Sequence, residues 1–523
     1  MIELYVREGF LYTETELKAA LHFDDSLERE FKKLLEVLKR RKIIRTRKVR
    51  GSVESYYDDA SVISEDETAY DDYIGEESNE SQYLFCFVGV FYYGERVVYV
   101  YPKYIESTKQ PRQEMKKVMR VLRKHQGKRI LWDEPEFIDN ADQGQDINEL
   151  SIALFLLNDY GNYGLYGVKE SVEEINGKGA INWSKTVNQI TPLIVDNRPY
   201  YFEMYTQGHV DNSTNFCARY HSYILTVITE ELDRIGLSDL FGLPILDLSD
   251  DEEDYFGDAD NILDEIDKEL RIQFDDRKKR VLKALEFYVQ IHNDKKIRAL
   301  KGDESLEFFG TRAFHKVWED LINAVYISQK ESSFKEIKKN YVPRLEHQLV
   351  LSDGTTVNID VERRLDSVID KPAWNLKDKV TGKKDVYWPS QTFIPDYLRF
   401  GNDCKHFYII DAKYYVPNWY KTKKKNNVIE RQPGVEDVAK QYMYFMAYKR
   451  LLMANKIDVE HVENYFVMPT ERKSFEAGDV GIDFFKDFIP NVFDIRVKML
   501  NADELYTDYL SDNWYDVAKI ASI

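Results

Sequence analysis

Apolar side chains recur at helical spacing in two stretches of the second half of the chain. Within residues 308–326, the apolar positions fall on one face of a helix: Phe314, Val317, Trp318, Leu321 and Val325. A second helical pattern covers residues 435–450. Between them, residues 407–410 form an apolar run of β-forming residues that is closed by Asp411. This mixture of helical and strand patterns predicts an α/β region.

The first half of the chain carries shorter patterns. Residues 83–105 are rich in β-branched and aromatic residues, and Gly94 and Glu95 mark the turn of an expected β-hairpin. Near the start, Thr13 and Glu16 are spaced as a capping box that opens a helix. Two short helices then precede a strand, and residues 39–50 hold eight Lys or Arg and no acid. A winged-helix-like module and a capping helix pair with a solvated basic edge both remain open interpretations.

Changes in pattern divide the chain into five expected segments, which give a mixed α+β multidomain protein. They are a winged-helix-like or capping module at 1–53, an acidic loop at 54–82, a mixed β/α partner-interaction domain at 83–245, an acidic linker at 246–260 and an α/β domain at 261–523. The three cysteines Cys86, Cys217 and Cys404 are far apart, which suits a reducing compartment. No signal-peptide pattern and no long apolar run occurs, so we expect a soluble cytoplasmic protein without a membrane partner.

The net charge of −19 taken alone argues against a nucleic-acid partner. Its distribution changes that conclusion, because residues 54–80 and residues 247–267 each hold 11 acids and no Lys or Arg. These two runs account for 22 negative charges, which leaves +3 for the remainder of the chain. Local basic surfaces can therefore still meet DNA phosphates.

The most specific chemical signal lies in residues 394–415. Pro395 and Asp396 lead, and Asp411 follows fifteen residues later at the end of the apolar run, with Lys413 two positions on. Side chains alternate along a strand, so Asp411 and Lys413 point to the same face. A surface salt bridge at a strand end is the alternative explanation. However, two carboxylates and an amine that converge at a buried strand are poor core material unless they are paired or bind a metal.

This set of groups suits phosphodiester hydrolysis. Carboxylate oxygens are the ligands that Mg²⁺ prefers, and Mg²⁺ commonly takes only one or two of them. The ion neutralises charge at a scissile phosphate and lowers the pKa of an attacking water. Lys413 can orient or deprotonate that water and stabilise the developing charge.

The pattern resembles the PD-(D/E)xK nuclease superfamily, which makes residues 261–523 the expected nuclease domain, with a restriction-endonuclease-like α/β core. The superfamily carries an acid on a preceding helix, and Glu319, beside Trp318, matches it, with Asp320 as its rival. Gln441 resembles the glutamine of the Q-x-x-x-Y motif of RecB-like nucleases, although Phe445 stands at the tyrosine position. The resemblance implies that Asp396, Asp411 and Glu319 serve the metal and that Gln441 orients Lys413 or a phosphate.

Taken together, VWED, IPDYL, FYIIDAKYY and DVAKQYMY resemble the LlaJI family of restriction endonuclease subunits, which are related to McrC. The resemblance runs from about residue 83 to the end of the chain. It implies a Mg²⁺-dependent DNA endonuclease subunit that works with an McrB-like AAA+ GTPase in defence against foreign DNA. The sequence agrees on one point: no G-x-x-x-x-G-K-[ST] phosphate loop occurs, so nucleotide hydrolysis would belong to another chain.

A basic run after the motif offers DNA contacts. It comprises Lys421, Lys423, Lys424 and Lys425, with Trp419 and Tyr420 beside it. A solvated loop is the alternative for this run. Two other functions also remain open: a stand-alone DNA repair or processing nuclease, and a non-catalytic DNA-binding scaffold with a nuclease-like fold.

Overall fold

The computed structural model describes residues 2–48, 81–132, 149–167, 169–211, 214–234, 236–300, 306–369, 373–377, 384–387, 394–421, 427–488 and 494–523. Two compact units make up the chain. One joins Met1–Arg129 to Gly310–Ile523, and the other is Ile130–Phe309. Each contains both helices and strands, so the expected mixed α/β class is confirmed. The acidic loop expected at 54–82 lies, apart from its last two residues, outside the described residues.

The N-terminal part of the first unit holds two sheets. Its elements are β1 (Ile2–Arg7), β2 (Leu11–Thr13), α1 (Glu14–Ala20), α2 (Glu28–Arg40), β3 (Ile44–Lys48), β4 (Ser81–Phe85), β5 (Val88–Tyr93), β6 (Arg96–Tyr101) and α3 (Arg112–Trp132). One sheet has the order β2-β4-β3, and the other has the order β1-β6-β5-β12, where β12 is Glu307–Thr311. The capping box of Thr13 and Glu16 is confirmed. The hairpin turn is confirmed too, because β5 and β6 pair antiparallel around Gly94 at φ +58°.

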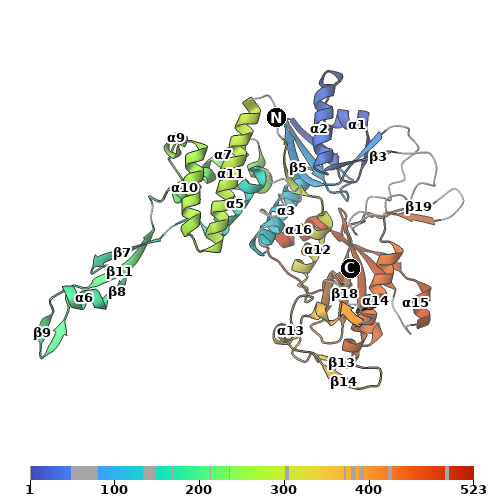
Figure 1. Cartoon of the computed structure of the whole chain (residues 1–523). Coiled ribbons are helices and arrows are strands. Elements are labelled where there is room, and N and C mark those ends of the chain that lie inside the picture. Colours follow the sequence, from blue (N-terminus) through green and yellow to red (C-terminus); the bar gives the residue numbers. More distant parts are fainter. Residues whose placement is uncertain are drawn as a thin grey trace. The chain divides into compact units, whose positions relative to one another are not determined.

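The C-terminal part of this unit, which includes β18 and α14 in Figure 1, contains the residues of the predicted nuclease motif. Its helices are α12 (Phe314–Val325), α13 (Phe334–Asn340), α14 (Val435–Ala454), α15 (Asp483–Phe488), α16 (Ala502–Leu510) and α17 (Ala518–Ala521). Its main sheet comprises β17 (Tyr397–Phe400), β18 (Phe407–Ala412), β21 (Val462–Thr470), β23 (Ile495–Asn501) and β22 (Phe475–Val480), in that spatial order. Strands β18, β21 and β23 run parallel, whereas β17 and β22 close the edges antiparallel. Three two-stranded ribbons accompany this sheet: β13 (Gln348–Val350) with β14 (Thr356–Asn358), β15 (Trp374–Lys377) with β16 (Lys384–Tyr387), and β19 (Asn418–Lys421) with β20 (Asn427–Glu430).

Helix α14 covers one face of the main sheet because its buried side chains match those of β18. Tyr444, Phe445 and Tyr448 pack in one cluster with Phe407 and Ile409. The helix expected at 435–450 is therefore confirmed and four residues longer. The helix expected at 308–326 begins only at Phe314, because residues 307–311 form β12 at the edge of a sheet.

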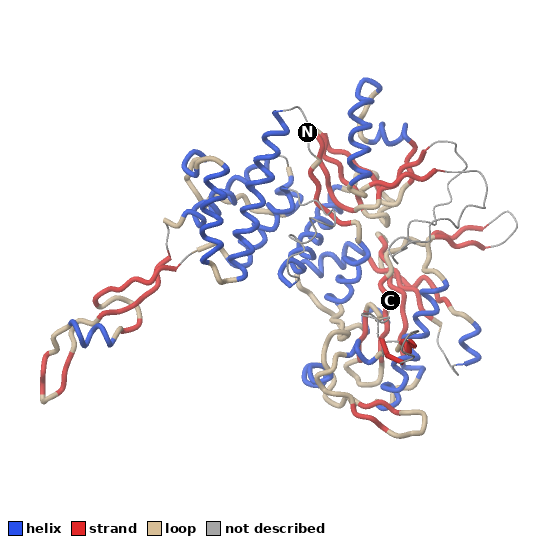
Figure 2. The backbone as a smooth tube through the Cα atoms, in the orientation of Figure 1, coloured by secondary structure: helices blue, strands red, loops and turns tan. Residues whose placement is uncertain are grey.

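The second unit is a helical body that carries a strand extension, drawn in blue and red in Figure 2. The body comprises α5 (Glu149–Tyr163), α7 (Phe216–Arg234), α8 (Leu237–Phe241), α9 (Glu253–Phe256), α10 (Ala259–Ile272) and α11 (Asp276–Leu300). The extension comprises β7 (Lys169–Ile175), β8 (Ala180–Ile181), α6 (Trp183–Gln189), β9 (Leu193–Val195), β10 (Arg198–Tyr200) and β11 (Tyr205–Asp211). Strands β7 and β11 form a long antiparallel pair, and β9–β10 is a separate hairpin toward the far end (Figure 1).

These units do not follow the five segments expected from sequence. Residues 83–129 share a compact unit with residues 310–523, whereas residues 261–309 belong to the helical unit. The segment 246–260 is no linker: Arg219 Nε donates to Asp251 Oδ2 at 3.1 Å, and the buried Phe256 packs its ring 5.1 Å from that of Tyr220. Segmentation along the sequence assumes contiguous domains, and the first unit is assembled from two distant parts of the chain.

Candidate functional site

The pairing of β17 with β18 brings Asp396 and Asp411 together. Tyr397 lies opposite Ile410, so the antiparallel register places the next residues outward, Asp396 and Asp411, opposite each other. Asp411 is 5% exposed. Asp396 is partly buried, and its Oδ2 accepts a hydrogen bond from the backbone N–H of Ala412 at 2.9 Å. The two carboxylates therefore share one end of the sheet, as the fifteen-residue spacing and the strand pattern suggested.

Lys413 joins this pair from the same face of the strand. Its Nζ lies 3.3 Å from Asp411 Oδ2 and 2.9 Å from Asp437 Oδ1. Asp437 also accepts a hydrogen bond on Oδ2 from the backbone N–H of Gly434 at 3.1 Å, which fixes its carboxylate at the start of α14. Sequence analysis missed Asp437. Its one signal is its place four residues before Gln441, on the same face of the helix.

The neighbouring acids Glu319 and Asp320 on α12 have different surroundings. Asp320 Oδ2 accepts a hydrogen bond from Tyr509 Oη at 2.7 Å and lies 3.1 Å from His125 Nδ1. Its carboxylate is thus part of the packing of α12 against α16 and α3. Glu319 is instead close enough to Asp411, Lys413 and Lys330 to interact with their charges. Of the two rivals, the electrostatic neighbourhood therefore favours Glu319 for the site.

Like charges and burial shape the protonation of the centre. Burial raises the pKa of Glu319 to about 7; Asp411 adds to the rise, and Lys330 opposes it. Burial and the facing Asp411 carboxylate raise the pKa of Asp396 well above its ordinary value. Burial alone would lower the pKa of Lys413, but Asp411 and Asp437 outweigh it and raise it. The centre thus combines the Lys413 ammonium, whose pKa is raised, with two carboxyls, those of Glu319 and Asp396, whose pKa values are also raised.

Gln441 lies on α14 one turn after Asp437, and it is fully buried. Its main-chain oxygen accepts a hydrogen bond from Asn464 Nδ2 at 3.3 Å. Within the described residues, its side-chain Oε1 and Nε2 have no hydrogen-bond partner. Asp437, rather than the side chain of Gln441, contacts Lys413, and the alternative that Gln441 orients a phosphate stays a prediction. Burying an amide without a hydrogen-bond partner costs free energy. A water or a substrate group that forms hydrogen bonds with this amide would therefore bind favourably here.

The donor set can be tested against a divalent cation. Among the described residues, no three His, Cys, Asp or Glu side chains gather closely enough to form a metal-binding group. Asp396 and Asp411 still supply two facing carboxylates, and Mg²⁺ commonly takes one or two and keeps several waters. A cation between them would relieve the repulsion that raises the pKa of Asp396. The two facing carboxylates are therefore compatible with Mg²⁺ binding, and Glu319 lies close enough to interact with the charge of Asp411.

The basic run after the motif is only partly described. Lys421 ends β19, which pairs with β20. Lys423, Lys424 and Lys425 lie outside the described residues. Their contact with DNA stays a prediction.

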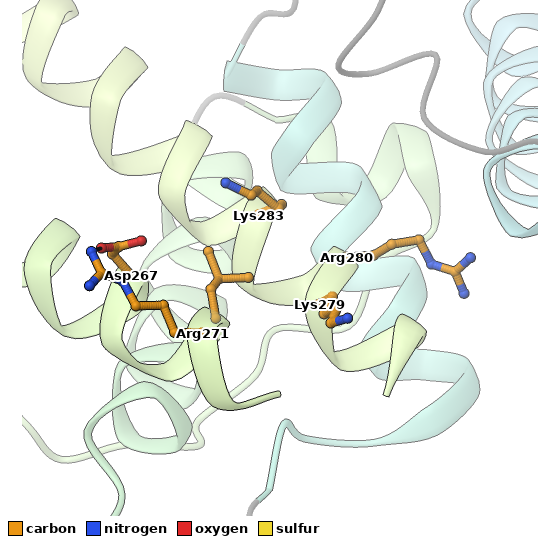
Figure 3. Close-up of a pocket in the computed structure, with 6 residues that line it drawn as sticks. Asp267, Arg271, Lys279, Arg280 and Lys283 are labelled. Atoms are coloured by element: carbon orange, nitrogen blue, oxygen red, sulfur yellow. Dashed lines mark hydrogen bonds and ion pairs between the residues drawn. The ribbon is translucent and has the colours of Figure 1, made fainter. Parts of the chain in front are cut away.

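A pocket of about 440 Å³ opens between α10 and α11 of the helical unit (Figure 3). It is lined by Asp267, Leu270, Arg271, Lys279, Arg280 and Lys283. Arg271 pairs with Asp267 at 2.6 Å, and Lys283 pairs with Glu286 at 2.7 Å. The pocket contains none of the predicted catalytic residues.

Comparison with known proteins identifies the class. The family model described as LlaJI restriction endonuclease matches residues 87–361 and 354–503. The chain belongs to the LlaJI restriction endonuclease family, as the motifs had indicated. A curated relative, the type II restriction enzyme BsuMI component YdjA of Bacillus subtilis (strain 168), is 27% identical over 455 residues, which are 84% of this chain and 83% of the relative.

Two solved structures are similar at a lower level. One is a chain of the Thermococcus gammatolerans complex of McrB AAA+ hexamers with bound McrC, with 13% identity and a TM-score of 0.30 over 98% of this chain and 100% of that chain. The other is a chain of the McrBC complex of the same organism, with 13% identity and a TM-score of 0.20 over 62% of this chain and 86% of that chain. TM-scores of this size do not establish a shared fold, so the family assignment rests on the sequence match.

Proposed function

We propose that the chain is a Mg²⁺-dependent DNA endonuclease subunit of a restriction system, with a PD-(D/E)xK centre at Asp396, Asp411 and Lys413. The observation that carries the proposal is the register that sets the two carboxylates face to face, with the Lys413 ammonium 3.3 Å from Asp411. Membership of a restriction endonuclease family supplies the substrate class. Structural ion pairs alone seldom place two carboxylates at one strand end with the pKa of one of them, here Asp396, raised well above its ordinary value.

The side chains have distinct roles in this proposal. A Mg²⁺ held by Asp396 and Asp411 would polarise the scissile phosphate and lower the pKa of a bound water. Lys413 is an ammonium in this setting, so it donates hydrogen bonds and stabilises negative charge rather than accepting a proton. Asp437 fixes its direction. Glu319, with a pKa of about 7, is suited to take a proton from the attacking water, directly or through a second water.

We further propose an AAA+ GTPase partner. The sequence has no phosphate loop of its own, so energy from nucleotide would enter through another chain. Among the side chains of the strand extension whose exposure is described, nine large apolar ones are exposed: Ile175, Ile181, Trp183, Val187, Leu193, Ile194, Val195, Tyr200 and Phe202. A surface of this kind is typical of a protein-binding site. No helix among the described residues has the length and apolar character to span a membrane.

DNA cleavage by the purified full-length chain tests the proposal. We expect Mg²⁺-dependent cutting with the partner and GTP, and binding without cutting when Ca²⁺ replaces Mg²⁺. Asp396→Ala, Asp411→Ala and Lys413→Ala should each abolish cutting, while circular dichroism spectra stay unchanged. Unchanged cutting by Asp411→Ala would exclude this centre.

The same assay separates the alternatives. Efficient cutting without partner or nucleotide would indicate a stand-alone repair or processing nuclease. DNA binding without cutting under every metal and partner condition would indicate a non-catalytic scaffold. The intact set of Asp396, Asp411 and Lys413 favours the nuclease over the scaffold, because a chain that has lost catalysis has no need of these charges.

A further inference from the structure

Another buried carboxylate, far from the motif in sequence, contacts the segment that follows β18 and carries Lys413. Glu8, immediately after β1, is 1% exposed. Tyr414 Oη donates a hydrogen bond to Glu8 Oε2 at 2.6 Å. The backbone N–H of Lys103 donates to the same oxygen at 3.2 Å. The first residues of the chain therefore hold the residue next to Lys413 through a short, charge-assisted hydrogen bond.

The ring of Tyr414 is fixed from other sides as well. The Nζ of Lys103 lies 4.6 Å from the ring centroid. The ring of Phe314, the first residue of α12, packs 5.0 Å from it. The backbone N–H of Lys103 also lies 3.3 Å from Tyr414 Oη. Tyr414 is thus clamped between the N-terminal sheet and the helix that carries Glu319.

These contacts bear directly on Lys413. Successive side chains of an extended chain point to opposite faces, so Lys413 faces Asp411 and Asp437 while Tyr414 faces Glu8. The backbone N–H of Lys413 donates to Val467 O on β21 at 3.0 Å. The backbone at Lys413 is therefore fixed in two ways. Its own N–H is bound to β21, and the next residue, Tyr414, is bound to Glu8.

We propose that Glu8 is a positioning residue of the nuclease centre, which sets the place of Lys413 through the hydroxyl of Tyr414. The inference rests on the proposed nuclease function and deepens it, because it makes the N-terminal sheet a part of the centre. A partner that moves β1 would thereby change the position of the ammonium. The burial of Glu8 without a catalytic task of its own is explained by this link.

Tyr414→Phe is the sharpest test, because it removes one hydroxyl and keeps the packed ring. The matched control is Tyr104→Phe, which removes the Tyr104 Oη to Tyr506 Oη hydrogen bond of 2.8 Å. Both tyrosines are about 5% exposed and both join the N-terminal part of the unit to the C-terminal part. The assay uses the full-length chain with Mg²⁺, partner and GTP, and measures kcat and KM for DNA separately.

We expect Tyr414→Phe to lower kcat roughly 10- to 100-fold with little change in KM, since misplacement of a catalytic group by about 1 Å can cost about 100-fold. Tyr104→Phe should keep the wild-type kcat even where both variants melt at the same lower temperature. Glu8→Gln, which keeps an acceptor oxygen, should retain most of the activity that Glu8→Ala loses. Combining Glu8→Ala with Tyr414→Phe should lower kcat no further than the more damaging single change.

Two results would overturn the proposal: a wild-type kcat for Tyr414→Phe, or an equal loss of kcat in Tyr104→Phe. If Glu8→Ala fails to fold, the kcat values of Glu8→Gln and Tyr414→Phe still test the proposal. If the wild-type chain proves inactive under every condition, the nuclease function fails separately. A crystal structure of Tyr414→Phe then decides the geometric claim, which fails if Lys413 Nζ keeps its 2.9 Å contact with Asp437 Oδ1.

Discussion

The proposed catalytic centre and the strand extension differ in which kinds of side chain they bury and which they expose. At the centre, charged side chains are buried or partly buried and have partners within the chain. Asp396 accepts a hydrogen bond from the backbone of Ala412, and Lys413 pairs with Asp411 and Asp437. In the extension, large apolar side chains are exposed, with Phe202 at 75% and Ile194 at 59%. Its buried side chains include two hydroxyl residues, Thr186 and Thr206.

This difference shows which region is complete within the chain. Buried charges are tolerated only where partners are already in place, so the centre is organised before substrate arrives. Covering exposed apolar side chains with another surface lowers the free energy, so the extension is suited to bind another molecule. The chain thus combines buried charged groups that are paired within the chain with an exposed apolar surface, which we propose a partner covers.

The largest effect should come from the centre itself. Asp411→Asn removes the charge that faces both Asp396 and Lys413 while it keeps the shape of the side chain. We expect cleavage to fall by about 1,000-fold or more, since both the electrostatic site and the metal ligand are lost. Partner binding, measured by pull-down, should stay unchanged, because the extension is untouched. If Asp411→Asn lost partner binding together with cleavage, the centre and the extension would not be functionally independent.

Local patterns sufficed for part of this centre. The apolar run before Asp411 and the helical spacing after Gly434 predicted β18 and α14, because both signals are contained in adjacent residues. The contact of Lys413 with Asp437 was not predictable, since it depends on how α14 returns onto β18. The contact of Glu8 with Tyr414 spans 406 residues, and periodicity carries no information on pairs so distant.

The second effect concerns the assembly of the first unit. Residues 310–523 depend on residues 2–129 through buried contacts, such as Tyr104 with Tyr506 and Glu8 with Tyr414. We expect a fragment of residues 310–523 to be insoluble or to lack a cooperative unfolding transition. A chain in which a flexible linker replaces residues 133–306, so that α3 and β12 stay intact, should unfold cooperatively. Cooperative unfolding of the isolated fragment would restore the contiguous nuclease domain that the sequence suggested.

A third change removes the extension and leaves its base. Ile175 pairs with Tyr205 across β7 and β11, so an Asn-Gly turn can replace residues 176–204. We expect partner-stimulated cleavage to fall roughly tenfold or more, because apolar anchors carry most of the energy of a protein interface. Partner-free cleavage and the melting temperature should stay as in the intact chain. Full stimulation of the shortened chain would show that the partner binds elsewhere.

The smallest expected effect concerns the adjacent acids Glu319 and Asp320. Substitution of the first should stabilise the metal-free chain at high pH, and substitution of the second should destabilise it. The pKa of Glu319 is raised by burial to about 7, so the folded chain binds its proton more tightly than the unfolded chain. Stability in the absence of metal should therefore decline as the pH rises from about 4.5 to about 7. Glu319→Gln mimics the protonated form, so it should stabilise the metal-free chain at pH 8 and have little effect at pH 4.5. After allowance for solvent screening of this partly exposed group, we expect a gain of roughly 1–2 kcal/mol in the free energy of unfolding at pH 8. Mg²⁺ should cancel this gain, because the cation compensates the charge of the site.

Asp320→Asn provides the matched comparison one residue along the same helix. It weakens the hydrogen bond from Tyr509 Oη and the contact with His125, so it should destabilise the chain with or without metal, by about 1 kcal/mol. Cleavage should suffer more from Glu319→Gln than from Asp320→Asn. Thermal unfolding of both variants at pH 5 and pH 8, with EDTA and with Mg²⁺, checks the signs. If Asp320→Asn is the variant that gains stability at pH 8 and loses cleavage, then Asp320 faces the carboxylate pair and Glu319 belongs to the packing of α12.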